Sequence, residues 1–171
     1  ARNVFETALN APNVVIHLAA SLLNTCGIER NPEFKLYRDG LSAGVIHCQK
    51  AIELEKDKIM ASMGYRSVVH TDYMEKLVQY DKFPELDCFR DLAGPDSMKH
   101  RYVIEDATVG NSILMKLGAV LGIPTPTVCA LVQIAGAINE ENYFEKGITL
   151  KDLGITGTTP DEINQYLYIG N

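Results

Sequence analysis

The sequence predicts an all-α domain, a bundle of about seven helices. Apolar residues recur at intervals of three and four residues in several segments, and these segments are bounded by helix-capping residues and by glycine or proline. The alternation typical of strands is absent, except for a short stretch near residues 66–70. A chain of 171 residues that is 46% hydrophobic can bury one core but is too short for two, so residues 1–171 are expected to form one helical domain.

The first helix is predicted from Asn13 to about Thr25, with Gly27 as its stop. Its polar residues recur at the spacing of a single helical face. They are Asn13, His17, Ser21 and Asn24. The next segment, residues 28–40, contains a proline and alternating charges and predicts a loop, which carries Tyr37.

A long helix is predicted over residues 42–63, capped by Ser42 and ended by Gly64. It contains a run of charges at residues 53–58, which we interpret as a solvated face. Two short helices are expected next, over residues 71–80 and 84–92. An extended segment over residues 98–105 then leads into the following helix.

Four further helices are predicted, three of them from their capping signals. Asp106 is placed as the N-cap of a helix that ends before Gly122. Thr125 followed by a proline is typical of a helix start, and a short helix is expected over residues 139–146. The pair Thr159 and Glu162 has the spacing of a capping box ahead of a final helix.

Composition excludes several classes of function. The net charge is −6 and no run of Lys or Arg occurs, which argues against nucleic acid or an anionic membrane as a partner. The most apolar region, residues 113–138, is interrupted by Lys, Gly, Pro and Gln and predicts two buried helices rather than a membrane span. The four cysteines are scattered without CxxC or metal-ligand spacing, so we expect no metal site and a reducing, cytoplasmic location.

No glycine-rich nucleotide loop or hydrolase motif is present in the sequence. The chain starts at Ala1 without a signal peptide, and we expect it to be part of a longer polypeptide.

Three residue types point to chemistry on an oxo acid. The segment 100–106 places Arg101 and Asp106 close together ahead of an apolar helix, and His17 lies on the polar face of the first helix. Imidazole titrates near neutrality and can protonate a reduced carbonyl or imine, while a carboxylate on its other nitrogen fixes the tautomer. The planar guanidinium suits a substrate carboxylate. Tyr37 is a further candidate for substrate contact.

Structural explanations compete with each of these roles. His17 could be an ordinary core residue, Asp106 could act only as a helix cap, and Arg101 could pair with Glu105 on a surface.

Several motifs together resemble a known family, the octopine/nopaline (opine) dehydrogenases, in their C-terminal helical domain. The similarity spans nearly the whole chain. The motifs, in order, are Asn13-Val-Val-Ile-His17, Ser21-Leu-Leu-Asn24, Gly27-Ile-Glu29, Arg101-Tyr102-Val-Ile-Glu105-Asp106 and Leu121-Gly-Ile-Pro124-Thr-Pro126.

The resemblance implies a helical domain like the C-terminal domain of 6-phosphogluconate dehydrogenase. It also implies an N-terminal Rossmann domain that binds NADH or NADPH and is missing from these residues, so that the chain alone is inactive. The substrates would be an amino acid and a 2-oxo acid such as pyruvate. The family's catalytic histidine falls on His17, its carboxylate partner on Asp106 and its substrate arginine on Arg101. The family commonly has proline after this histidine, whereas this chain has Leu18, which affects the expected helix start and pocket.

Two other interpretations stay open at this point. One is a different two-domain dehydrogenase, such as a ketopantoate reductase or 3-hydroxyacid type. Those typically rely on a lysine or glutamate acid, and no lysine is well placed beside the Arg101–Asp106 segment. The other is a non-catalytic interaction module in which Arg101, Glu105 and Asp106 form a solvated ion cluster. Contact between His17 and Asp106 would favour chemistry. The choice of cofactor, the two substrates and the oligomeric state, including a homodimer, are not determined.

Overall fold

The computed structural model describes residues 1–169, and every regular element in that range is helical, which confirms the all-α prediction. The elements are α1 (Val4–Leu9), α2 (Asn13–Leu23), α3 (Thr25–Arg30), α4 (Leu36–Asp39), α5 (Ala43–Ser62), α6 (Thr71–Leu77), η1 (Pro84–Leu86), α7 (Asp87–Arg90), α8 (Arg101–Glu105), η2 (Asp106–Gly110), α9 (Asn111–Leu121), α10 (Pro126–Asn139), α11 (Tyr143–Lys146) and α12 (Pro160–Ile169).

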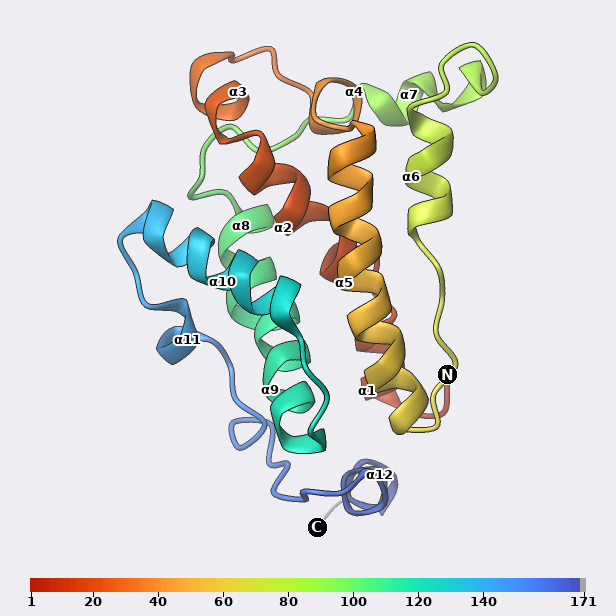
Figure 1. Cartoon of the computed structure of the whole chain (residues 1–171), viewed down its shortest axis with the longest axis vertical. Helices are drawn as coiled ribbons and strands as arrows, with labels where there is room; N and C mark the ends of the chain where they lie inside the picture. Colours follow the sequence, from red (N-terminus) through yellow and green to blue (C-terminus); the bar gives the residue numbers. More distant parts are fainter. Residues whose placement is uncertain (170–171) are drawn as a thin grey trace.

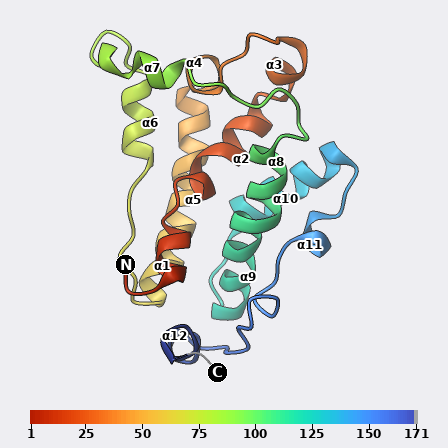
Figure 2. The ribbon, with the colours of Figure 1, turned by 180° about the vertical axis from the view of Figure 1, so that it is seen from behind.

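Helix α2 is the centre of the bundle. It packs against α5 on one side and against α8, η2 and α10 on the other (Figures 1 and 2). Every residue from Val14 to Leu22 is buried, including His17 and Ser21. A helix buried on all sides belongs to the core, so the polar face predicted from the sequence faces other helices rather than solvent.

The chain between α2 and α5 differs from the prediction. Gly27 lies inside α3 instead of ending α2, and residues 36–39 of the predicted loop form α4. A Cβ atom on Gly27 would lie 2.9 Å from the ring of Phe34. The glycine is therefore needed for a close aromatic contact and does not act as a helix stop.

The long helix α5 is confirmed, with the Ser42 side chain accepting the Val45 N–H at its start. Its charged run is not a solvated face, and that prediction was wrong. Glu53, Glu55 and Lys56 are all buried, while Leu54 between them is 61% exposed.

The buried charges of α5 bind the ends of neighbouring segments. Glu55 accepts the backbone N–H groups of Thr127 (2.8 Å) and Val128 (3.1 Å) at the start of α10. Glu53 accepts the N–H of Thr71 (3.3 Å) at the start of α6. The first N–H groups of a helix lack partners within that helix, and a carboxylate supplies them with hydrogen bonds and a favourable charge. The charges are thus buried because other helices begin against α5.

The segment before α6 is not a strand in the described part of the chain. Its backbone is instead paired by the side chain of Asn10, which donates to the Arg66 carbonyl (2.8 Å) and accepts the Val68 N–H (2.8 Å). The predicted helices at 71–80 and 84–92 are present but shorter, as α6 and as η1 followed by α7.

Asp106 does not begin a helix, and residues 101–105 are not extended. The helix begins at Arg101, where the His100 imidazole caps the Tyr102 N–H (3.2 Å). It continues through a π-helical turn, η2, into α9 and ends at Gly122, whose φ of 68° is the left-handed conformation that glycine tolerates. Asp106 is consequently inside a continuous helical run, and its side chain is available for a tertiary contact.

Near the C-terminus, the predicted helix at 139–146 is divided: α10 extends to Asn139 and α11 begins at Tyr143. The capping box is confirmed, because Thr159 Oγ1 accepts the Glu162 N–H (3.3 Å) and Glu162 accepts the Thr159 N–H (3.1 Å).

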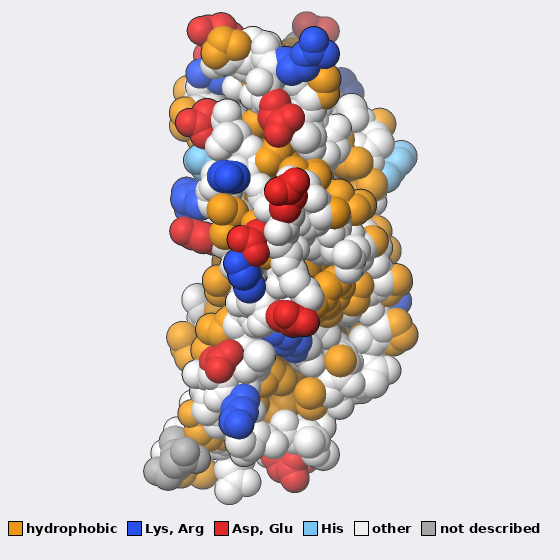
Figure 3. Space-filling view, turned by 90° about the vertical axis from the view of Figure 1, so that its left-hand side faces the viewer, with side chains coloured by type: hydrophobic (Ala, Val, Ile, Leu, Met, Phe, Trp, Pro, Cys, Tyr) orange, Lys and Arg blue, Asp and Glu red, His pale blue; other side chains and the backbone are white. Residues whose placement is uncertain are grey.

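The surface and helix lengths bear on the expected partners. Acidic and basic side chains are intermixed on the face shown in Figure 3, without a continuous patch of one sign. Across residues 1–169, none of the helices combines the length and apolar character needed to cross a bilayer.

The role of Glu55 as a buried cap can be tested by Glu55→Ala. We expect a loss of about 3 kcal/mol in the free energy of unfolding, because two N–H groups at the start of α10 lose a charged partner. Urea unfolding followed by circular dichroism measures this. Leu54→Ala on the same helix is the control and should change stability by less than about 0.5 kcal/mol; equal effects of the two changes would contradict the capping role.

Candidate active site

His17 and Asp106 lie in direct contact. The imidazole Nδ1 is 3.0 Å from the Asp106 carboxylate, although the two residues are 89 positions apart in the chain. Both side chains are buried, and His17 is only 6% exposed. Since a carboxylate only accepts hydrogen bonds, Nδ1 carries the proton and the tautomer of His17 is fixed.

The other nitrogen of His17 binds Tyr37. The Nε2 atom is 2.8 Å from the Tyr37 hydroxyl, and the Tyr37 ring packs against Phe89 of α7 (centroids 4.7 Å apart). Burial, and then the neighbouring Tyr102 and Asp106, raise the pKa of Tyr37 well above its ordinary value. The phenol therefore stays protonated at neutral pH, and His17 is held at both nitrogens.

Tyr102 covers one face of the histidine. Its ring stacks on the His17 ring with centroids 3.7 Å apart and planes 12° apart. The edge of His100 and the guanidinium of Arg101 lie against Tyr102, at 4.7 Å and 5.0 Å from its centroid. In the sequence, Tyr102 stands out only as part of the Arg101-Tyr102 motif. Its position directly after Arg101 is the one local signal, and helical spacing cannot show which ring it stacks on.

Arg101 is exposed and forms no ion pair with a carboxylate of residues 1–169, so the surface pair with Glu105 considered above is not formed. Its positive charge is near enough to oppose the rise in the pKa of both Tyr37 and Asp106. Asp106 is buried against His17, which also argues against a solvated cluster of Arg101, Glu105 and Asp106. The guanidinium is thus free to bind an anionic ligand.

Asp106 is held in place by the π-helical turn. The Asn111 side chain donates to the Asp106 carbonyl (3.0 Å), and turns of this kind occur frequently at functional sites. Burial raises the pKa of the Asp106 carboxyl more than the His17 hydrogen bond and the charge of Arg101 lower it. Ionised Asp106 therefore carries a net cost in the folded state.

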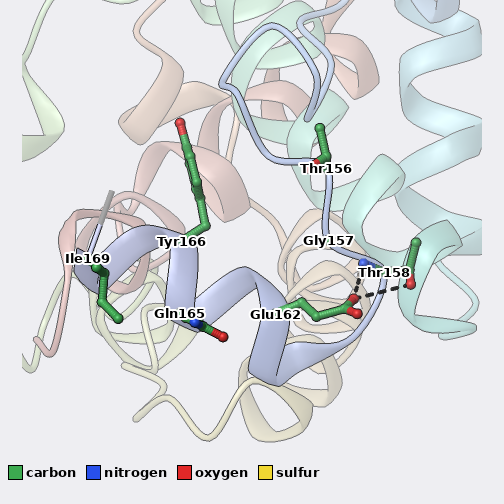
Figure 4. Close-up of a pocket in the computed structure, with 7 residues that line it drawn as sticks. All are labelled: Thr156, Gly157, Thr158, Glu162, Gln165, Tyr166 and Ile169. Atoms are coloured by element: carbon green, nitrogen blue, oxygen red, sulfur yellow. Dashed lines mark hydrogen bonds between the residues drawn. The ribbon is translucent and has the colours of Figure 1, made fainter. Parts of the chain in front are cut away.

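An apolar groove of about 300 Å³ lies beside this pair, between α1, α2 and η2, and Asp106 forms part of its wall. A larger hollow at the opposite end of the chain lies between α12 and the loop before it (Figure 4). There the Glu162 carboxylate is occupied by Thr158 and Thr159. None of His17, Asp106 and Arg101 lines that hollow.

No three side chains of the types that bind metals come together anywhere in residues 1–169. The described residues also contain no strand followed by a glycine loop and helix, the unit that cradles a dinucleotide phosphate. We therefore assign no cofactor contact to these residues.

The helical domain thus places a buried histidine, held by a carboxylate and a phenol, close to an arginine that has no ion-pair partner in residues 1–169. Sequence comparison identifies the class of protein. Residues 1–139 match the family model for the NAD/NADP octopine/nopaline dehydrogenase, alpha-helical domain, and the chain belongs to this family.

Individual relatives extend the match toward the C-terminus. The chain is 28% identical to the opine dehydrogenase of Arthrobacter sp. (strain 1C), over 92% of this chain and 45% of the relative. It is 26% identical to the vitopine synthase of Allorhizobium ampelinum (strain ATCC BAA-846 / DSM 112012 / S4) and 24% identical to the protein ocs of Agrobacterium vitis, in both cases over 88% of this chain and 44% of the relative. The chain therefore spans less than half the length of these relatives.

The cost of ionised Asp106 predicts a pH dependence. A carboxyl whose folded pKa is raised above its ordinary 3.8 stabilises the fold at low pH and loses that contribution as the pH rises through the folded pKa. Asp106→Asn lacks this titration, so the variant should gain stability relative to the parent chain between acidic and neutral pH. Urea unfolding at a series of pH values measures the difference; a difference that is constant, or that moves the other way, would contradict the prediction.

Proposed function

We propose that this chain is the helical half of an NAD(P)H-dependent opine dehydrogenase that reductively condenses an amino acid with a 2-oxo acid such as pyruvate. The hydrogen bond between His17 and Asp106 is the observation that carries this proposal, because it joins two elements that only the fold brings together. A dinucleotide-binding Rossmann domain of the same polypeptide would hold NADH or NADPH, which supplies hydride. The length of the relatives, of which this chain spans 45% or less, supports such a second domain.

His17 is assigned the proton transfer. When the carbon of an imine or carbonyl is reduced, its nitrogen or oxygen must take up a proton, and imidazolium is the usual donor near neutral pH. Asp106 holds Nδ1 and stabilises the charged ring, which leaves Nε2 as the nitrogen that exchanges the proton. The Tyr37 hydroxyl, 2.8 Å from Nε2, marks the position where we place a substrate contact.

Arg101 is assigned the substrate carboxylate. Both substrates carry a carboxylate, and a planar guanidinium binds one through two parallel hydrogen bonds. Arg101 is exposed and directly precedes Tyr102, which covers His17 in this structure. Binding at Arg101 would therefore be coupled to movement of the ring that shields the proton donor, as expected for a site completed by domain closure.

The remaining proposals concern the cellular location of the protein and the cofactor that it uses. The four cysteines are unpaired, which supports our prediction of a reducing, cytoplasmic location. The identity of NADH or NADPH as the working cofactor is read out by the assay below.

The function is tested on a polypeptide that includes the residues preceding Ala1, by following NADH and NADPH oxidation with pyruvate and a panel of amino acids. Oxidation that requires both substrates supports the condensation. Reduction of an oxo acid alone would instead indicate a simple dehydrogenase.

In that enzyme, His17→Asn should lower kcat by about 10²- to 10⁴-fold, because the proton donor is lost. His47→Asn is the matched control, since His47 is an exposed histidine on α5, and its kcat should be unchanged. Unaltered turnover in His17→Asn would remove the assignment of His17 as proton donor.

Arg101→Gln should raise the KM of the oxo acid or amino acid that it binds, by roughly tenfold or more, since a charge-assisted hydrogen-bonded pair contributes about 1.5 to 3 kcal/mol. Steady-state kinetics with each substrate varied in turn shows which carboxylate is involved. Arg30→Gln, at an exposed arginine of α3, serves as the control. Identical KM values for both substrates in Arg101→Gln and the parent enzyme would exclude the role.

A further inference from the structure

The ring of Tyr102 contacts two groups that can carry a positive charge. The His17 imidazole stacks on it with centroids 3.7 Å apart, and the guanidinium carbon of Arg101 lies 5.0 Å from the centroid of the same ring. The face of an aromatic ring attracts cations, and this attraction is stronger when the pair is shielded from water. His17 is buried and Tyr102 is half-buried. The ring therefore interacts more favourably with a protonated imidazole than with a neutral one.

The position of the Tyr102 ring is set by the start of α8, a helix that packs against α2. The His100 Nδ1 atom accepts the Tyr102 N–H (3.2 Å). The His100 ring also lies perpendicular to the Tyr102 ring, with centroids 4.7 Å apart and planes 88° apart. Both the backbone and the ring of Tyr102 are thus held by His100, so the stack on His17 is fixed by packing.

The hydrogen bonds of His17 suit both of its protonation states. Nδ1 donates to Asp106 in either state. The Tyr37 hydroxyl donates to Nε2 of the neutral ring and can accept the Nε2–H of the charged ring, because a phenol is both a donor and an acceptor. Protonation therefore leaves neither nitrogen without a partner, and the stacked ring of Tyr102 adds to the stability of the charged form.

The charges around His17 leave room for this contribution. Arg101 opposes a positive charge on His17, whereas Asp106 favours one, and Glu105 adds to the negative charge near Asp106. In the described chain, α10 has no charged residue, and the half-buried thiols of Cys48 and Cys129 make no hydrogen bond to His17. The charged residues of α3, α4 and α5 are exposed or bound to other segments: Glu29, Arg30, Arg38, Asp39, His47, Lys50, Glu53, Glu55, Lys56, Asp57 and Lys58.

We propose, on the basis of the function proposed above, that Tyr102 is a positioning residue for the proton transfer and that its stacked ring keeps His17 protonated until the substrates bind. Arg101 connects this effect to binding. When a substrate carboxylate draws the guanidinium and the neighbouring ring away from His17, the imidazolium loses the face of the ring. It then gives its Nε2 proton more readily to the nitrogen or oxygen of the reduced substrate.

The first test measures the protonation of His17 directly, in the enzyme that includes the residues preceding Ala1 and without substrates. Heteronuclear NMR of the imidazole signals over a pH series gives the midpoint of titration, and the signal that is lost in His17→Asn identifies His17. Tyr102→Leu keeps an apolar cover without an aromatic face, and its midpoint should fall by about 0.5 to 1 pH unit. Tyr102→Phe keeps the ring and should retain the midpoint of the parent enzyme.

Tyr168→Leu is the matched control, because Tyr168 is an exposed tyrosine of α12, away from α2 and α8 (Figure 1). The midpoint of His17 should not change in this variant. An unchanged or higher midpoint in Tyr102→Leu overturns the inference, since the ring would then only shield His17 from water.

The second test follows the kinetics over the same pH range, with pyruvate varied at a fixed, low concentration of the amino acid. The pH dependence of kcat/KM reports the free enzyme and that of kcat reports the enzyme with its substrates bound. In Tyr102→Leu, kcat/KM should fall about three- to tenfold relative to the parent enzyme above the midpoint and change little below it. The pH dependence of kcat should stay that of the parent enzyme. A loss of kcat/KM that is equal at every pH, as misfolding produces, contradicts the inference.

The outcomes separate the two proposals. If no pair of amino acid and oxo acid supports oxidation of the cofactor, the proposed function fails, and the role of Tyr102 in proton transfer fails with it. If the enzyme is active but the midpoint of His17 in Tyr102→Leu is unchanged or higher, the inference alone is overturned.

Discussion

The hydrogen bond between His17 and Asp106 is the constraint on which the rest of this structure depends. It places an imidazole and a carboxylate inside the bundle, where polar groups are costly unless they are paired. To form it, α2 must be buried on all sides and α8 must continue without a break through the π-helical turn. The second nitrogen of His17 is satisfied by Tyr37 of α4, whose ring packs against Phe89 of α7. The contacts of one histidine and its partners thus join α2, η2, α4 and α7.

A second group of buried charges supports this arrangement from α5. Glu53 and Glu55 accept N–H groups at the starts of α6 and α10, and Lys56 donates to the Val68 carbonyl (2.7 Å). These contacts fix helix ends, which hydrophobic packing alone does not specify. They differ from Asp106 in their energetic role: the carboxylates of α5 bind several backbone donors, whereas ionised Asp106 carries a net cost of burial. Such a cost is expected where a group serves chemistry rather than stability.

The site is also closed on one face, with Tyr102 stacked on His17. Arg101 lies on the exposed side of Tyr102 and the apolar groove lies on the Asp106 side of the pair. The guanidinium and the groove therefore lie on different sides of the His17–Asp106 pair.

The sequence by itself determined the helical class, most helix positions and the identity of His17, Asp106, Arg101 and Tyr37 as candidates, because periodicity, capping residues and motif order are local signals. It also carried the family resemblance, which residues 1–139 confirm. Only the tertiary structure decided what the charges do. The local sequence predicts that Glu53 and Glu55 face solvent and that Asp106 caps a helix. A local pattern cannot show which backbone groups another helix will bring nearby. The stacking of Tyr102 and the groove beside Asp106 depend on contacts between segments about a hundred residues apart, and such contacts are set by packing.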